Sequence, residues 1–134
     1  MMTNPTKNKK VNISDKYLRE LLRKVVSLRA GGQCEYPGCS NTDCDPHHWR
    51  SKKNNAVKYD YNSCINLCCE HHTDSLLSAH KSPACFQSVI INSGARSNEW
   101  ADKVALQSRQ TVKLTESFLV QCKESLLREI ERLK

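Results

Sequence analysis

The pattern of cysteines and histidines constrains this chain most. It has eight cysteines in 134 residues, and two pairs of adjacent histidines lie close to them. The start of the chain is polar and basic and lacks the apolar segment of a secretory signal. No stretch of the sequence is long and apolar enough to span a membrane. We therefore expect a cytoplasmic protein without a membrane partner, and in that compartment reduced thiols favour metal binding over disulfides.

Two closely spaced ligand pairs predict a structural zinc site. The first pair is Cys-x4-Cys, the second is Cys-x2-His, and a long gap separates them. Zn²⁺ favours thiolate and imidazole ligands in a tetrahedral arrangement, and its binding contributes folding energy directly. A staple of this kind suits a chain that is only 38% hydrophobic and 6% aromatic. The preferred ligands are Cys34, Cys39, Cys68 and His71.

The remaining cysteines leave alternatives open. Cys44 or Cys69 could replace a member of the preferred set, and the thiols could instead be buried without a metal. The last three lie in apolar contexts and are expected to act as small core residues. They are Cys64, Cys85 and Cys122.

Hydrophobic periodicity predicts a helix at the N-terminal end of an α+β domain. Residues 1–12 are polar and lysine-rich and are expected to be disordered, whereas 13–134 form a single domain. Ser14 is a plausible N-cap, and Gly31-Gly32 ends the helix. Leucine and valine recur on one face of this helix at spacings of three and four residues, and basic residues fall largely on the other.

The rest of the chain alternates turns with short apolar segments. We expect a hairpin with strands at about 47–50 and 64–67, followed by a helix over 71–80. Pro83 can begin the next helix, and Asn98 can cap a further short one. Apolar spacing from residue 114 to residue 133 then predicts a long amphipathic helix.

Three segments, taken in order, resemble the HNH endonucleases. They are "DPHHWRSK", "YDYNSCINLCCEHH" and "HKSPACF". The chain is most similar to the small zinc-containing HNH proteins often encoded by phages, over roughly residues 34–86. The resemblance implies a zinc-stapled ββα-metal core with an N-terminal helix and C-terminal helices over 87–134. It also implies metal-dependent hydrolysis of DNA phosphodiester bonds, in the host cytoplasm if the protein is phage-encoded.

The resemblance also assigns catalytic roles. His47 and His72 are expected to hold a divalent cation, Mg²⁺ or another available metal, and His48 is expected to be the general base. Histidine suits this role because it titrates near neutral pH. Asp45 could ligate the cation instead, or orient a histidine. The alternative is that both residues of the first histidine pair are further zinc ligands.

Two positions depart from the family pattern. The motif asparagine, which holds the loop and keeps the base in place, is replaced by Ser63, and Asn62 precedes it. Either residue could take its role. Leu76 occupies the place of a further family histidine, and His80 lies eight residues after His72, a rise of about 12 Å in a continuous helix. His80 would therefore join the cation site only if the helix breaks near 75–78, and we favour a surface role for it.

The basic charge indicates a polyanionic partner, most simply DNA. The net charge is +7, and the excess lies in residues 1–33, where eight Lys or Arg accompany two acids. Between the two expected strands, four basic residues are expected to contact phosphates, and the first of them could also stabilise charge at the scissile phosphate. They are Arg50, Lys52, Lys53 and Lys58. The alternative is a solvated loop.

Three other functions remain open at this stage. One is a zinc-stabilised nucleic-acid-binding module without cleavage activity, which the two departures favour. Another is a junction-selective recombination nuclease, because "HHWRSK" resembles a segment of phage recombination nucleases. The third is an interaction protein that uses the C-terminal helix as its partner surface.

Overall fold

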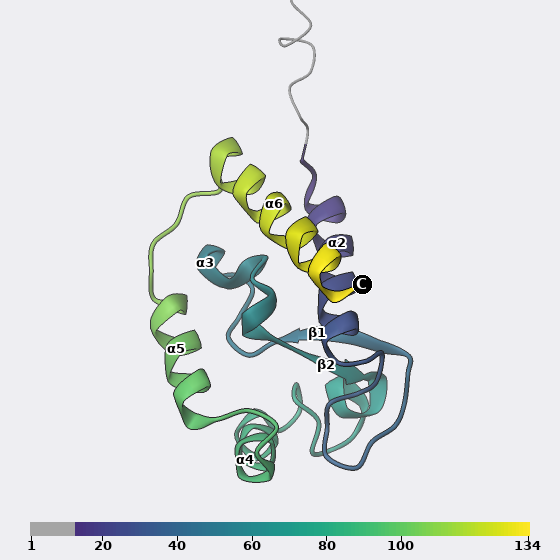
Figure 1. Cartoon of the computed structure of the whole chain (residues 1–134). Helices are drawn as coiled ribbons and strands as arrows, with labels where there is room; N and C mark the ends of the chain where they lie inside the picture. Colours follow the sequence, from purple (N-terminus) through teal and green to yellow (C-terminus); the bar gives the residue numbers. More distant parts are fainter. Residues whose placement is uncertain (1–12) are drawn as a thin grey trace, which may run out of the picture.

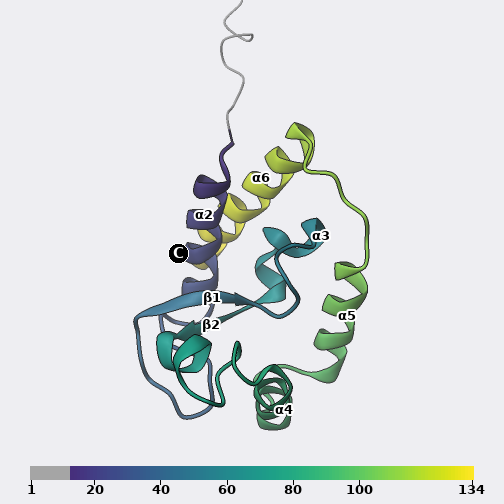
Figure 2. The same cartoon turned by 180° about the vertical axis from the view of Figure 1, so that it is seen from behind.

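The computed structural model describes residues 13–134 and shows helices arranged around a two-stranded antiparallel sheet (Figure 1), an α+β arrangement as expected. The expectation for residues 1–12 lies outside the described residues. In Figures 1 and 2 the sheet lies between α2 and α6 on one side and α4 on the other. The elements are α2 (Asp15–Arg29), β1 (Cys44–His48), α3 (Asn55–Lys58), η1 (Tyr61–Ser63), β2 (Cys64–Cys68), η2 (Glu70–Asp74), α4 (Pro83–Ser93), α5 (Asn98–Ser108) and α6 (Glu116–Leu133).

Helix α2 begins and ends as its sequence predicts. The Ser14 hydroxyl accepts a hydrogen bond from the backbone N–H of Tyr17 at 3.0 Å, which satisfies one of the free donors of the first turn. At the other end, Gly31 and Gly32 have φ of 65° and 78°, a conformation that favours glycine. The Gly32 N–H donates to the Ser27 carbonyl at 2.8 Å and closes the helix.

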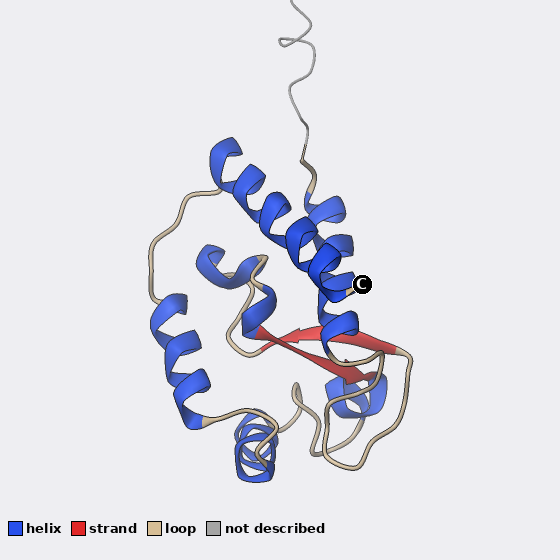
Figure 3. Ribbon diagram, in the orientation of Figure 1, coloured by secondary structure: helices blue, strands red, loops and turns tan. Residues whose placement is uncertain are grey.

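The hairpin forms where expected, but β1 starts three residues earlier than predicted. In the ladder His47 faces Ile65 and His48 faces Cys64 (Figure 3, red). Pro46, which indicates a turn in the sequence, lies inside β1 opposite Asn66. A two-stranded sheet leaves each strand one free edge, and a proline is tolerated there because it needs no ladder hydrogen bond.

Two small cores lie against the hairpin. The first packs α4 and α5 against the sheet, and Trp49 is buried in it. Its other buried members are Cys34, Ile65, Leu67, Cys68, Ala79, Phe86, Ile90 and Val104. The second packs α6 across α2 and includes Leu18, Leu22, Val25, Val26, Tyr59, Cys64, Leu126 and Ile130.

The three C-terminal helices follow the predicted order. Helix α4 begins at Pro83 and is capped after Ser93 by Gly94, whose φ is 83°. Ser97 caps α5, one residue earlier than predicted, and accepts a hydrogen bond from the N–H of Trp100. Thr115 caps α6 in the same way. Within residues 13–134, no helix has both the length and the apolar character needed to cross a bilayer.

We expect Leu126→Ala to lower the free energy of unfolding by about 2–5 kcal/mol, the usual loss when a fully buried leucine is truncated. Leu126 is 0% exposed between α6 and α2, whereas its neighbour Leu127 is 39% exposed. Leu127→Ala is therefore the matched control and should have a much smaller effect. Urea denaturation followed by circular dichroism measures both. Equal losses would contradict the packing of α6 on α2.

Candidate metal centres and active-site cleft

The predicted zinc ligands converge at the end of the hairpin. Ligand atoms of Cys34, Cys39, Cys68 and His71 all lie within 4.8 Å of one another, so the group could hold a metal ion. The distances are 3.6 Å from Cys34 Sγ to His71 Nδ1, 3.9 Å from Cys39 Sγ to Cys68 Sγ, and 3.3 Å from Cys68 Sγ to His71 Nδ1. A tetrahedral zinc ion places such atoms about 3.5–3.8 Å apart. The four residues therefore fit a zinc ion.

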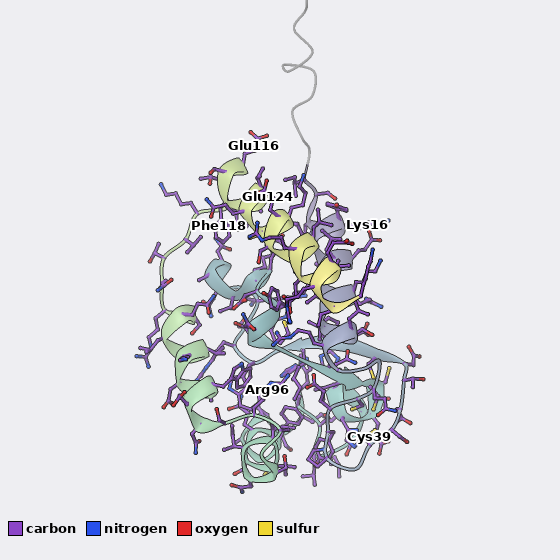
Figure 4. The ribbon with its side chains drawn as sticks, viewed as in Figure 1. Lys16, Cys39, Arg96, Glu116, Phe118 and Glu124 are labelled. Atoms are coloured by element: carbon purple, nitrogen blue, oxygen red, sulfur yellow. The ribbon has the colours of Figure 1, made fainter. Side chains whose placement is uncertain are left out.

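Backbone hydrogen bonds and one glycine determine the shape of the loop that carries Cys34 and Cys39. The Cys34 N–H donates to the Asn41 carbonyl at 2.8 Å, and the Cys39 N–H donates to the Tyr36 carbonyl at 3.0 Å. Gly38 has a φ of 80°, which supplies the reversal between the two cysteines. As a result both sulfur atoms face β2. Figure 4 shows sulfur atoms gathered beside η2, near the label of Cys39.

Two residues that the sequence did not mark support this group. The Asn41 amide donates to Cys68 Sγ at 3.4 Å, and the Tyr36 ring stacks on the His71 imidazole with centroids 4.0 Å apart and planes at 3°. Burial alone would raise the pKa of Cys68, but hydrogen bonds from Asn41 and His71 lower it to about 6. Burial dominates at Cys34 and raises its pKa. Cys68 is thus the sulfur best prepared to act as a thiolate.

The other cysteines lie outside this group. Cys44 is half-buried with Sγ directed to the Asn41 carbonyl at 3.4 Å, and Cys69 is exposed. Neither alternative ligand is therefore brought to the cluster. Cys64 is buried and Cys122 half-buried, as expected of core residues. Cys85 is exposed on α4, so the expectation of a core role is wrong for that residue, because its apolar neighbours in sequence lie on another face of the helix.

Three histidines form a second group that could hold a metal ion. Ligand atoms of His47, His72 and His80 lie within 4.8 Å of one another, and the Nε2 atoms of His72 and His80 are 3.0 Å apart. The His47 ring lies 5.2 Å from each of the other two, centroid to centroid. Phe86 contacts the His47 ring from the core side, edge to face. These histidines come from β1, η2 and the loop after η2.

The prediction of a helix over 71–80 is wrong for the residues after Asp74, where the helical turn ends. This break brings His80 to the three-histidine group. After η2 the backbone adopts an extended conformation at Ser75, where ψ is 151°. The chain then folds back, and the His80 N–H donates to the His72 carbonyl at 3.0 Å. His80 is exposed, but our preference for a surface role alone is wrong, because its imidazole completes the group with His47 and His72.

Adjacent histidines of η2 serve different groups. This element is one π-helical turn, a wide turn that is common at functional sites. His71 faces the cysteines, while His72 faces His47 and His80. The two groups are therefore tied together by a single peptide bond.

Burial favours the neutral imidazole at His47, His72 and His48. It lowers the pKa of His47 to about 3, with further lowering from His72, His80 and His48. Burial also lowers the pKa of His72 and of His48. A neutral imidazole offers a lone pair, which both metal binding and proton acceptance require.

His48 lies outside the three-histidine group and has a partner of its own. Its Nε2 lies 2.9 Å from the backbone carbonyl of Lys58. A carbonyl oxygen only accepts hydrogen bonds, so Nε2 carries the proton and the lone pair is on Nδ1. The hydrogen bond thereby sets both the ring orientation and the tautomer, which is the state that a general base needs.

Asp60, which the sequence did not mark, holds the loop that carries this carbonyl. Its carboxylate accepts from the backbone N–H of Asn62 at 3.1 Å and from the Ser63 hydroxyl at 2.7 Å. Ser63 is fully buried, and its carbonyl accepts from the N–H of Trp49 at 2.9 Å, next to His48. The Asp60–Ser63 pair thus connects the loop to β1.

Asn62 takes no part in that connection through its side chain. The side chain is exposed, and its Oδ1 accepts from Arg29 of α2 at 2.9 Å. Its backbone carbonyl accepts from the Trp100 indole at 2.7 Å. Of the two residues expected to replace the motif asparagine, Ser63 is the one placed between the loop and β1.

A cleft of about 490 Å³ contains the histidines and part of the basic loop. Its lining comprises Pro46, His47, His48, Ser51, Lys52, Lys53, His72 and His80. Arg50 is exposed and outside this lining. Lys58 directs Nζ to Asp15 of α2 at 3.8 Å, away from the cleft. Asp45 forms an ion pair with Arg23 at 2.8 Å and is not part of the three-histidine group.

We expect Cys68→Ser to lose the one zinc per chain that the cysteine group would hold and to destabilise the fold, because it removes the thiolate next to His71. The adjacent residue provides the matched control: Cys69 is exposed and outside the group, so Cys69→Ser should keep one zinc per chain. Metal content is measured by atomic emission after gel filtration, and thermal unfolding with and without a chelator measures stability. Zinc retained by Cys68→Ser and lost by Cys69→Ser would contradict the assignment.

Comparison of the chain with protein-family models, with curated proteins and with solved structures finds no match.

Proposed function

We propose that the protein is a metal-dependent HNH endonuclease that hydrolyses phosphodiester bonds in DNA. The observation that carries the proposal is that the four imidazoles of one cleft fall into a group of three and a separate fourth. Three of them form a group that could hold a cation, and the fourth, His48, lies apart and has its tautomer set by the Lys58 carbonyl. This arrangement supports a metal site beside a general base.

In this mechanism His48 Nδ1 accepts a proton from the attacking water. The Lys58 carbonyl holds the imidazole during this transfer, and the Asp60–Ser63 pair holds the loop that carries the carbonyl. Lys52 and Lys53 bind phosphates at the rim of the cleft. A divalent cation held by His47, His72 and His80 would polarise a phosphoryl oxygen and stabilise the leaving oxygen.

The donor set favours a transition metal in this site over Mg²⁺. Three neutral imidazoles suit Ni²⁺ or Zn²⁺ and bind Mn²⁺ more weakly, whereas Mg²⁺ prefers carboxylate and water oxygens. Asp45, the carboxylate considered as an alternative ligand, is paired with Arg23. We further propose that the Cys34, Cys39, Cys68 and His71 group holds a structural Zn²⁺, in a cytoplasm that keeps its thiols reduced.

A second candidate is a nucleic-acid-binding module that does not cleave. The observation that favours it is that the Asn62 side chain accepts a hydrogen bond from Arg29 and does not hold the loop near His48. In that case the basic loop would bind DNA and the three-histidine group would be without catalytic consequence.

We expect the zinc-loaded protein to nick supercoiled plasmid when Mn²⁺ is added, and His48→Ala to be slower by about 10²–10⁴-fold because the proton acceptor is gone. Conversion of supercoiled to open-circular DNA on agarose gels measures the rate. The variant must keep its zinc and its DNA affinity. Equal cleavage by the parent protein and by His48→Ala would show that His48 is not the general base. Binding without cleavage by either protein would favour the binding module.

We expect His80→Ala to weaken Mn²⁺ binding by about tenfold or more, because one of three ligands is lost. His48→Ala is the matched control, since it removes an imidazole from the same cleft but not from the three-histidine group. Isothermal titration of zinc-loaded protein with Mn²⁺ measures both affinities without relying on activity. Equal affinities in the two variants would contradict the assignment of the site.

A further inference from the structure

The loop between His72 and His80 presents two adjacent leucines to solvent. Leu76 is 80% exposed and Leu77 is 56% exposed, which makes Leu76 the most exposed large apolar side chain of residues 13–134. Single exposed leucines are ordinary on protein surfaces. A pair on a tight loop between two members of a histidine cluster needs a more specific explanation.

The C-terminal part of this loop is buried, and hydrogen bonds hold it to the preceding chain. Ser78 and Ala79 are 0% and 3% exposed. The Ala79 N–H donates to the His71 carbonyl at 2.8 Å, and the Ser78 N–H donates to the Ser75 carbonyl at 3.0 Å. The chain on either side of the leucines is thus anchored to η2.

Its tip is fixed as well. The Ser82 hydroxyl donates to the Leu76 carbonyl at 2.6 Å, and the Leu77 N–H donates to the Ser75 hydroxyl at 3.3 Å. Lys81 Nζ donates to the Asp74 carbonyl at 2.9 Å and bridges the loop from end to end. The leucines therefore project from an ordered loop, so little conformational entropy is lost when they enter a partner.

The position of the loop limits what the leucines can contact. Leu76 is four residues from both His72 and His80, so its Cα lies within about 14 Å of the Cα of either residue. Along one DNA strand this corresponds to about four nucleotide steps. A phosphate bound at the three-histidine group would therefore have the Leu76 backbone within about four nucleotide steps of its ligands.

The charges beside the leucines fit a polyanion. Lys52 and Lys53 line the cleft, and Lys81 lies at the end of the loop. The loop itself contributes one acid, Asp74, whose carboxylate accepts a hydrogen bond from Thr73. An apolar tip with flanking lysines matches the way that proteins insert leucine between base steps and unstack them.

We propose that Leu76 and Leu77 form a wedge that enters duplex DNA at a base step next to the phosphate in the cleft. This inference rests on the proposed function, because it assumes that DNA occupies the cleft. It also names the substrate form: a duplex that is unstacked or kinked beside the cleaved bond. A step that is already poorly stacked, such as a mismatch, costs less to open and is the preferred site.

The test compares Leu76→Ser/Leu77→Ser with Leu106→Ser, a control in which a 62% exposed leucine is removed from α5. All proteins carry His48→Ala, so that cleavage is slow relative to the binding measurement. Fluorescence anisotropy measures affinity for a 30-base-pair duplex, either fully paired or with one central mismatch. 2-Aminopurine beside the mismatch reports unstacking.

We expect the parent and Leu106→Ser to bind the mismatched duplex about tenfold more tightly, with a rise in 2-aminopurine fluorescence. The double variant should bind both duplexes alike and without the rise. A parent that does not discriminate, or a double variant that keeps the preference, would overturn the wedge. The leucine substitutions could instead leave the DNA preference unchanged and dissociate a dimer. That result would identify a second copy of the chain as the partner of the two leucines.

These outcomes are separate from those that decide the proposed function. Nicking by the protein with an intact His48, combined with equal binding of both duplexes, would retain the nuclease and reject the wedge. Mismatch preference and unstacking without any nicking would retain the wedge on a protein that binds but does not cleave. Absence of DNA binding by the parent would reject both.

Discussion

The peptide bond between His71 and His72 is the constraint on which both candidate metal centres depend. His71 closes the cysteine group, and His72 belongs to the three-histidine group. Cys68, at the end of β2, lies three residues before His71, so a metal held by these two residues would fix η2 against the hairpin. The position of His72 opposite His47 follows from that anchoring. Loss of the cysteine group would thus misplace a ligand of the second site.

A folded chain with so little apolar material needs such anchoring. The hairpin is short, and the two cores lie against it rather than merging into one. An ion pair reinforces the free edge of β2: Glu35 accepts from the Asn66 N–H through one carboxylate oxygen and contacts Arg96 at 2.7 Å through the other. Arg96 also donates to the Cys64 carbonyl. These contacts connect the cysteine loop, β2 and the start of α5 without apolar burial.

Burial and positive charge in the cleft both favour the neutral imidazole, which is the form that can accept a proton. Burial lowers the pKa of His47, His48 and His72, and Lys52 lowers that of His48 further. Asp60 acts on His48 in the opposite direction and also holds the adjacent loop. The same residue therefore influences both the charge and the placement of the proposed base, which a sequence motif based on asparagine does not indicate.

Local patterns in the sequence predicted what depends on local physics. Ser14 and Gly31-Gly32 bound α2, Pro83 begins α4, and the spacings of Cys34, Cys39, Cys68 and His71 indicated the group that converges at the hairpin. Caps, positive φ and closely spaced ligands act over a few residues, so they are visible without a fold. The assignment of His47 and His72 to one site came from the family resemblance, and the structure brings their rings together.

The roles proposed for His80, Asp60 and Leu76 rest on contacts that only the tertiary structure shows. His80 reaches His72 because the chain turns extended at Ser75 and returns, whereas an unbroken helix would separate the two residues. Asp60 and the Lys58 carbonyl matter only because the loop packs beside β1. Spacing along a chain defines distances only inside a regular element. Wherever an element ends, the backbone hydrogen bonds of the fold determine which side chains meet.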